Sequence, residues 1–376
     1  MPKLVVLLEQ VLAPVPGGTG RYSRELTAAL AATAPAGWTV GSAVARHADL
    51  TPAMIPGVEG PHLLPLPRQA LIAAWDSGVP LWPGGDTVHA PTPLAPPGPR
   101  RGRDLVVTVH DTVPWTHPHG LTRRGVGWHR RMIGRAARRA GALVVPTEAV
   151  ADDLPRHVAC RAAVHVVGAG VSPAVVCAGG EQRAGVIAAG LDLPPRYVLA
   201  VGTLEPRKGI DTLLAALAEP NAPDLPVLLA GQQGWGRVDP AEVARRVELD
   251  PGRVRVLGRI SDAELAVVLH RAAVLAAPSQ AEGFGLPVLE AMAAGVPVVH
   301  SDAPALVEVA GGAGVMFARN DPAALATALR AVLSDPARAD GMIAAGRRRA
   351  QQFTWEQTAR RVWSVHVGLY AARPSG

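Results

Sequence analysis

Lysine is scarce in this 376-residue chain, which contains two lysines, Lys3 and Lys208, against thirty-five arginines. Glycine and proline are abundant, and this composition is typical of a GC-rich genome, in which arginine replaces lysine. A lysine that persists against such a bias indicates a position where arginine is a poor substitute. Lys208, in the stretch GTLEPRKG, is therefore a candidate functional residue.

Cysteine is nearly absent as well, since Cys160 and Cys177 are the two in the chain. They are too few for a disulfide framework, and neither belongs to a CxxC or histidine-rich spacing that would bind zinc. We expect both to be buried apolar residues. The chain also lacks an apolar run long enough to span a membrane, so we expect a cytoplasmic protein.

The sequence contains no two aspartates separated by one residue. Such a pair commonly binds the divalent ion that accompanies a diphosphate, so its absence predicts a site that needs no metal or other cofactor. The net charge of +6 and the pI of about 10.1 fit nucleic acid, an anionic membrane face or a phosphate-rich ligand. Three Tyr, three Phe and no recognised nucleic-acid motif argue against nucleic acid.

The length of the chain and its hydrophobic content of 48% predict two domains. Short Val- and Leu-rich runs alternate with helix-like stretches, which is typical of a parallel sheet covered on both faces, and the pattern restarts after an aperiodic segment. We predict an α/β fold with Rossmann-like domains over residues 1–175 and 176–354. A last helix, residues 355–376, packs back on the first domain, and residues 50–100 form loops and short helices.

The stretch RYVLAVGTLEPRKGIDTLLAAL predicts a strand, a loop and a helix, with Lys208 on the loop. Ligands bind at the carboxyl ends of strands in open α/β sheets, so we interpret Lys208 as a phosphate contact rather than a solvent-exposed lysine. Arg207 has two interpretations. It contacts the ligand, or it forms a salt bridge with Glu205 between the domains.

The stretch PSQAEGFGLPVLEAMAAGVPVV predicts a strand end, a glycine-containing loop and a helix that begins near Leu286 and ends at Gly295. Gly285 and its neighbours allow a ligand to approach bare backbone, and the helix N-terminus attracts an anion such as a diphosphate. Glu282 precedes this anion site, and Glu290 lies about one turn inside the helix. Because an ionised carboxylate accepts two hydrogen bonds or more, Glu290 suits the hydroxyls of a ribose and Glu282 those of a sugar ring.

His110 ends the apolar strand LVVTVH, and this strand-end position favours a functional histidine over a structural one. Seven arginines lie between residues 121 and 141, where the default interpretation is a solvated helix face. A second interpretation is peripheral contact with the inner membrane face or a phosphate-bearing lipid. The arginines that can share one side of that helix are Arg131, Arg135, Arg138 and Arg139.

Several of these stretches resemble one enzyme family. EGFGLPVLEAMAAGVPVV is similar to the paired-glutamate motif of family 4 retaining glycosyltransferases with the GT-B fold, and VGTLEPRKG is similar to their phosphate-binding loop. GGTGRYSRELTAAL resembles their amino-terminal glycine-rich loop, and TVHDTVPW their His-containing strand end. The resemblance covers most of the chain outside residues 50–100 and implies two Rossmann-like domains that face each other across a cleft. The motifs are most similar to the GDP-mannose-dependent mannosyltransferase branch.

The resemblance implies roles for the matching residues. The implied catalytic residues are His110, Lys208 and Glu282. The implied donor-binding residues are Gly18, Arg207, Lys208, Gly258, Ile260, Phe284, Gly285, Leu286 and Glu290. Glu290 is expected at the ribose, Lys208 and Arg207 at the diphosphate, and the residues from Gly258 to Ile260 beside the base. Many relatives have an arginine where this chain has Thr203, so we expect Arg207 to supply more of the positive charge.

We therefore predict a retaining glycosyltransferase that moves a hexose from a nucleoside diphosphate sugar to a hydroxyl of a glycan or lipid-linked acceptor. GDP-mannose is the first donor to consider, and UDP-sugars stay open. A nonhydrolysing sugar-nucleotide epimerase shares the two-domain architecture but is expected to lack the paired glutamates. No acidic pair in the chain has the pattern of a glycosidase's acid and nucleophile, and retention is implied by the family alone.

The missing aspartate pair leads to a direct prediction about metal. Sugar transfer should continue in excess EDTA, because Lys208, Arg207 and a helix N-terminus supply the positive charge that stabilises the departing diphosphate. The measurement is the initial rate of transfer with and without chelator. Loss of activity in EDTA, restored by magnesium or manganese, would contradict this prediction.

Overall fold

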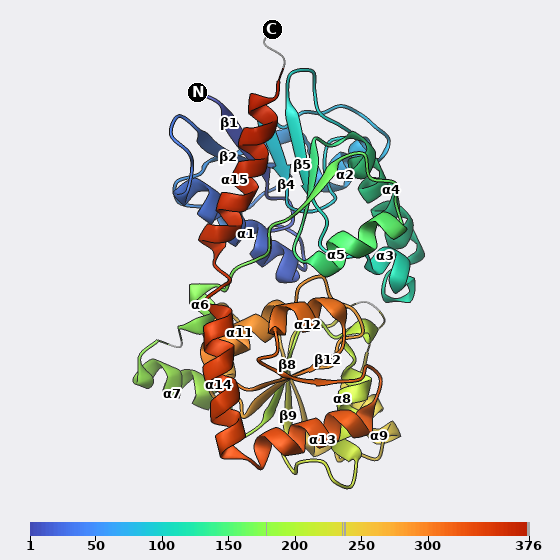
Figure 1. Ribbon diagram of the computed structural model, residues 1–376, viewed down its shortest axis with the longest axis vertical. Helices are drawn as coiled ribbons and strands as arrows, with labels where there is room; N and C mark the ends of the chain where they lie inside the picture. The colour runs from blue at the N-terminus through green and yellow to red at the C-terminus, as the bar shows by residue number, and fades with distance from the viewer. Residues whose placement is uncertain (178, 235, 237, 374–376) are drawn as a thin grey trace. The chain divides into compact units, whose positions relative to one another are not determined.

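The computed structural model describes residues 1–177, 179–234, 236 and 238–373, which form two compact units (Figure 1). Unit 1 comprises Met1–Pro118, Arg123–Gly170 and the chain from Thr354 onward, and unit 2 comprises His119–Thr122 and Val171–Phe353. The chain therefore leaves unit 1 after Gly170 and returns to it at Thr354. These crossings lie within a few residues of the limits that the sequence suggests.

Unit 1 is built on a parallel sheet that has seven strands within the described residues, in the order β3-β2-β1-β4-β5-β6-β7. The strands are β1 (Lys3–Leu7), β2 (Thr39–Arg46), β3 (Glu59–Pro67), β4 (Thr87–Ala90), β5 (Asp104–Thr108), β6 (Ala142–Val145) and β7 (Ala163–Val166). The strand order reverses between β1 and β4. Sheets of this kind bind ligands where the order reverses, at the carboxyl ends of the strands.

Helices cover both faces of this sheet. They are α1 (Gly17–Ala32), α2 (Arg68–Asp76), α3 (Val113–Thr116), α4 (Arg123–Arg139), α5 (Glu148–Asp153) and α15 (Trp355–Ala371). α1 and α15 pack together on one face (Figure 1). Apolar residues of α2, α4 and α5 pack on the other, where Trp75 and Ile133 meet strand residues such as Val107.

The last helix belongs to unit 1. Thr354 caps it, since its side chain accepts a hydrogen bond from the backbone N–H of Gln357. Trp363 Nε1 donates to the carbonyl oxygen of Leu30 in α1 at 3.0 Å. The final segment of the chain thus supplies part of the core of the first domain.

Unit 2 has a parallel sheet of six strands within the described residues, in the order β10-β9-β8-β11-β12-β13. They are β8 (Val198–Val201), β9 (Val227–Ala230), β10 (Val254–Gly258), β11 (Val274–Ala277), β12 (Val298–Ser301) and β13 (Val315–Phe317). At the centre of the sheet, Leu199 of β8 is paired with Leu228 of β9 on one side and with Leu275 of β11 on the other. The order reverses between β8 and β11, the two strands that precede the predicted ligand-binding loops.

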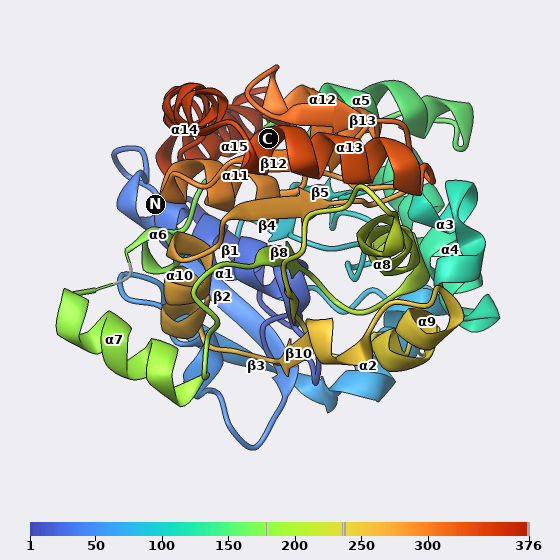
Figure 2. The same ribbon diagram turned by 90° about the horizontal axis from the view of Figure 1, so that it is seen from below.

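The helices of unit 2 also lie on both faces of their sheet. They are α6 (Pro173–Val176), α7 (Glu181–Gly190), α8 (Ile210–Ala218), α9 (Pro240–Arg246), α10 (Asp262–His270), α11 (Leu286–Ala294), α12 (Pro304–Ala310), α13 (Pro322–Leu333) and α14 (Pro336–Ala350). Residues of α8, α9 and α13 share a core with the strands. α6 and α7 lie beside α10 (Figure 2). Among the described residues, no helix is both long and apolar enough to cross a bilayer.

Three expectations from the sequence are wrong in detail. Residues 50–100 contain two strands of the sheet, β3 and β4. The sequence did not reveal β3 because it is an edge strand, where its three prolines are tolerated, and it did not reveal β4 because this strand contains a single Val. The aperiodic segment between the domains contains the ten-residue helix α7. Cys177 is exposed and Cys160 is half-buried, because Cys177 follows the short surface helix α6 rather than a strand.

Two buried histidines connect α15 to the sheet of unit 1. His366 Nδ1 lies 2.7 Å from Thr87 Oγ1, and His366 Nε2 lies 3.2 Å from His89 Nδ1. On the other side of its ring, His89 Nε2 lies 3.1 Å from Thr108 Oγ1. Burial, with a smaller contribution from His110, lowers the pKa of His89 to about 3, and burial followed by repulsion from His89 lowers the pKa of His366. Both rings are therefore neutral in the folded protein.

This pair predicts that unit 1 loses stability in mild acid. An unfolded histidine takes up a proton below about pH 6.5, whereas the folded pair resists protonation. Between pH 7 and pH 5.5, each histidine therefore lowers the free energy of unfolding by about 1 kcal/mol. The free energy of unfolding, measured by urea titration at both pH values, should fall accordingly. In His366→Asn the overall stability should be lower and the pH dependence weaker. An unchanged pH dependence in this variant would contradict the assignment.

Candidate nucleotide-sugar site

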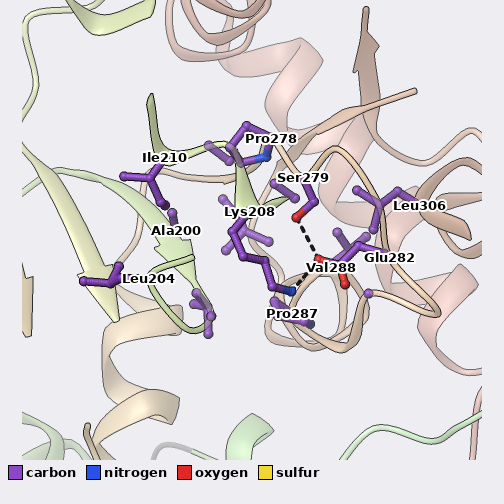
Figure 3. A pocket seen from close by; sticks show the side chains of 16 residues that line it. Ala200, Leu204, Lys208, Ile210, Pro278, Ser279, Glu282, Pro287, Val288 and Leu306 are labelled. Carbon is purple, nitrogen blue, oxygen red and sulfur yellow. Dashed lines mark hydrogen bonds and ion pairs between the residues drawn. The ribbon is translucent and has the colours of Figure 1, made fainter. Parts of the chain in front are cut away.

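The candidate site lies in unit 2, at the carboxyl ends of β8 and β11. The loop after β8 and the loop after β11 meet there and line a pocket, which Figure 3 shows from close by. The lining residues that belong to the motifs singled out in the sequence are Gly202, Lys208, Glu282 and Gly285, and Ser279 lies beside them. The pocket thus stands at the reversal of strand order, where α/β sheets bind their ligands.

Lys208 reaches this pocket from a short 3₁₀ turn, Pro206–Lys208, which follows β8. The turn ends at Gly209, whose φ of +66° favours glycine. A side chain at Gly209 would also collide with the carbonyl oxygen of Pro278, so this backbone packs directly against the second loop. The Lys208 chain runs past Gly202, and its ammonium lies 2.5 Å from Oε1 of Glu282 (Figure 3).

Glu282 is the anion at the centre of the site. Its Oε1 accepts hydrogen bonds from Lys208 and, at 2.7 Å, from the hydroxyl of Ser279, while its Oε2 lies 3.3 Å from Arg207 Nη1. The side chain is 12% exposed. Burial alone would raise the pKa of Glu282, but the attraction of Lys208 and then of Arg207, together with these hydrogen bonds, lowers it to about 2. Glu282 is therefore ionised at neutral pH.

Arg207 joins the two loops. Its Nη1 donates to the carbonyl oxygen of Ala281 at 2.9 Å, and its own carbonyl oxygen accepts from the N–H of Gln280 at 2.7 Å. Its Nη2 lies 2.7 Å from Glu205 Oε1. The salt bridge considered from the sequence is present, but both partners belong to unit 2 and so it does not cross between domains. A role for Arg207 at a diphosphate stays a prediction.

α11 begins as the sequence predicts, at Leu286, and ends with Gly295 in the left-handed conformation. Gly285 precedes it with a φ of +98°, and a side chain there would collide with Leu306. Glu290 lies inside α11, is 1% exposed, and does not line the pocket. Phe284 is buried and packs edge-on against Phe353, with ring centroids 5.8 Å apart.

The other predicted donor residues lie at a neighbouring strand end. Gly258 ends β10 with a φ of +68°, and a side chain there would meet no atom within 4 Å. Ile260 follows it and is half-buried. Neither residue lines the pocket, so the structure does not join them to Lys208 and Glu282.

In unit 1, the predicted residues lie around the carboxyl ends of β1 and β5. His110 follows β5, and its Nε2 donates to the carbonyl oxygen of Pro91 at 2.7 Å, which leaves Nδ1 without a proton in the neutral ring. Tyr22 packs edge-on against the ring, with centroids 4.7 Å apart. Burial lowers the pKa of His110, although the bond to Pro91 and the charge of Asp111 act against it. Gly18 lies in the first turn of α1.

The arginine face of α4 is partly occupied within unit 1. Arg131 Nη2 lies 2.7 Å from a carboxylate oxygen of Asp76 at the end of α2, and Arg135 Nη2 donates to the carbonyl oxygen of Asp76 at 2.6 Å. Arg138 and Arg139 are exposed. Two of the four arginines therefore help to fasten α4 to α2, and membrane contact stays a prediction that rests mainly on the other two.

Sequence reasoning missed two residues that shape the site. Ser279 is buried and donates to Glu282, and Arg319 donates to Asp302 at 2.7 Å and to the carbonyl oxygen of Gln280 at 3.1 Å. Ser279 could have been noticed because it lies three residues before Glu282, next to the strand end. Arg319 gave no signal, because its contact depends on how the ends of β11, β12 and β13 meet.

The two Rossmann-like units define the GT-B class of fold, and comparison with known families gives the same result. A family model described as Glycosyltransferase Family 4 matches residues 16–175, and one described as Glycosyl transferases group 1 matches residues 187–349. Together they match most of the chain, in the order in which the two units follow one another. The chain belongs to the family 4 glycosyltransferases.

Individual relatives match parts of the chain. It is 38% identical over 163 residues to O-antigen chain mannosyltransferase B of Escherichia coli, which covers 43% of this chain and 42% of that protein. It is 33% identical over 260 residues to D-inositol 3-phosphate glycosyltransferase of Kineococcus radiotolerans, covering 63% and 59%. The chain thus spans about half the length of these two curated relatives.

A solved structure is similar over nearly the whole chain. The Anabaena HepE protein, in complex with UDP and glucose, matches with a TM-score of 0.74 at 18% identity, over 98% of this chain and 100% of that chain. At this identity the likeness shows a common fold.

The conformation at Gly285 predicts a large cost for a small substitution. Gly285→Ala forces an alanine into a left-handed conformation and against Leu306, and it should lower the free energy of unfolding by about 2–4 kcal/mol. Urea titration measures this. As a control, Gly185→Ala in α7 places its methyl group where no atom lies within 4 Å, and it should be neutral or stabilise by about 0.5–1 kcal/mol. Equal effects of the two substitutions would contradict the role of Gly285.

Proposed function

We propose that this protein transfers a hexose from a nucleoside diphosphate sugar to a hydroxyl group of a glycan or lipid-linked acceptor. The first candidate donor is GDP-mannose, from which mannose would be transferred, because a mannosyltransferase is among the relatives that are 38% identical. UDP-sugars are the second donor class. Membership of a glycosyltransferase family favours this proposal over a sugar-nucleotide epimerase and over a nucleic-acid-binding protein.

The observation that supports the proposal best is the pairing of Lys208 and Glu282 in one pocket beside the start of α11. A diphosphate needs positive charge and N–H donors, which the ammonium and the helix N-terminus offer. A hexose needs hydrogen-bond acceptors, which the ionised carboxylate of Glu282 offers. The two halves of a sugar nucleotide therefore have complementary partners within a few ångströms of one another.

Within this proposal, the residues divide the donor between them. Lys208 contacts the diphosphate and stabilises the charge that develops on the leaving group. The N–H groups at Phe284, Gly285 and Leu286 contact the phosphates, and Glu282 accepts from the hydroxyls of the hexose. Glu290 accepts from the ribose. Gly258 and Ile260 stand beside the base, and a Cβ at Gly258 would meet no atom within 4 Å.

Arg207 has a different place in this scheme from Lys208. Its guanidinium already contacts Glu205, Glu282 and the backbone of Ala281, and its side chain is 18% exposed. We assign it to the edge of the diphosphate, where it adds charge and fixes the geometry of the loop. His110 and Gly18 of unit 1 complete the proposal, His110 as a catalytic residue next to the transferred sugar and Gly18 at the phosphates. Retention of configuration and independence from metal belong to it as well.

The donor can be identified by thermal unfolding against a panel of GDP- and UDP-sugars and the free nucleotides. A ligand at a hundred times its dissociation constant stabilises the folded protein by about 2.7 kcal/mol, which shifts the unfolding temperature measurably. Stabilisation by GDP-mannose supports the first donor, and stabilisation by a UDP-sugar supports the second. No shift with any nucleotide would contradict the proposal.

Lys208→Arg tests why the chain keeps a lysine here. The ammonium is a compact charge held between Gly202 and Glu282. Lys208 Cε lies 3.4 Å from the position that a Cβ at Gly202 would occupy, so there is little room for a guanidinium, which is wider and planar. Lys208→Ala should lower kcat by about a hundredfold, on the order of 3 kcal/mol, and Lys208→Arg should recover part of this loss while keeping most of the nucleotide affinity. Steady-state kinetics and calorimetry measure the two effects. Transfer at the parental rate by Lys208→Arg would contradict the assignment.

A further inference from the structure

The positive charge expected to bind a diphosphate is paired with a carboxylate of the site itself. The ammonium of Lys208 lies 2.5 Å from Oε1 of Glu282, and the two side chains are 15% and 12% exposed. Ser279 and Arg207 hold the same carboxylate in place. An incoming diphosphate must therefore take Lys208 from a carboxylate that is itself an anion.

The two possible nucleotide ligands differ in what they offer Glu282. A hexose attached to the diphosphate has hydroxyl groups, which donate hydrogen bonds to the carboxylate and replace the bond from Lys208. A free nucleoside diphosphate has only acceptor oxygens at that end. It therefore leaves Glu282 short of a donor and brings phosphate charge towards a buried carboxylate, which is repulsive.

We propose that Glu282 competes with the diphosphate for Lys208 and so makes the site favour a sugar nucleotide over the free nucleoside diphosphate. This inference rests on the proposed function. It makes Glu282 a specificity-determining residue as well as a contact of the sugar. After transfer the hexose departs, Glu282 regains Lys208, and the product nucleotide is released more readily.

The test compares two binding constants in the parental protein and in Glu282→Gln, which removes the charge and keeps the shape of the side chain. Calorimetry gives the dissociation constant of GDP and UDP and of the corresponding sugar nucleotides, without acceptor. The variant should bind the free nucleoside diphosphate at least about tenfold more tightly, since close charges couple by more than that factor. Its affinity for the sugar nucleotide should not rise by the same factor, so the preference for the donor should fall.

A matched control is Glu205→Gln. It removes a carboxylate of similar burial from the loop that carries Lys208, but that carboxylate contacts Arg207 and not Lys208. The control should leave the ratio of the two dissociation constants unchanged. Glu282→Asp withdraws the carboxylate from the ammonium without removing the charge. It should change the ratio of the two dissociation constants in the same direction as Glu282→Gln and by less. This variant replaces Glu282→Gln in the test if the glutamine variant does not fold.

Two results would overturn the inference, and they bear differently on the proposed function. If both proteins bind nucleotides and the ratio is the same in Glu282→Gln as in the parent, the competition is absent while the proposed donor site stands. If neither folded protein binds any of the nucleotides, both the inference and the proposed function are wrong.

Discussion

The ion pair between Lys208 and Glu282 is the interaction on which the site depends. It joins the loop that leaves β8 to the loop that leaves β11, at the reversal of strand order in the second sheet. Ser279 and Arg207 strengthen the same junction from either side. Because two cations and a hydroxyl surround one carboxylate, burial of the charge is offset, whereas removal of Lys208 would leave only Arg207 and Ser279 to compensate it.

The backbone makes this pairing possible. Gly209 and Gly285 adopt conformations with positive φ; a side chain at Gly209 would collide with Pro278 of the second loop, and one at Gly285 with Leu306 of α12. These close approaches bring the two strand ends together and set the start of α11 beside the ammonium. A charged site of this kind is thus built on backbone geometry first and on side-chain chemistry second.

The sequence predicted the parts of the structure that have a local signal. Val- and Leu-rich runs marked the central strands, and the positions of Leu286, Gly295 and Thr354 gave the ends of their helices correctly. β3 was missed because an edge strand tolerates proline, β4 because it contains a single Val, and β13 because it has only three residues. The contacts of Arg207 with Ala281 and Glu282, and of Arg319 with Gln280, escaped for another reason: they link residues that are far apart in the sequence and come together only in the folded chain.

The most direct test of this account is a crystal structure of the protein with a bound nucleoside diphosphate sugar. The account predicts phosphate density within hydrogen-bond distance of Lys208 and of the backbone N–H groups before α11, with the hexose hydroxyls on Glu282 and the ammonium moved away from that carboxylate. A nucleotide bound elsewhere, or a Lys208–Glu282 pair that stays intact beside the phosphates, would contradict it.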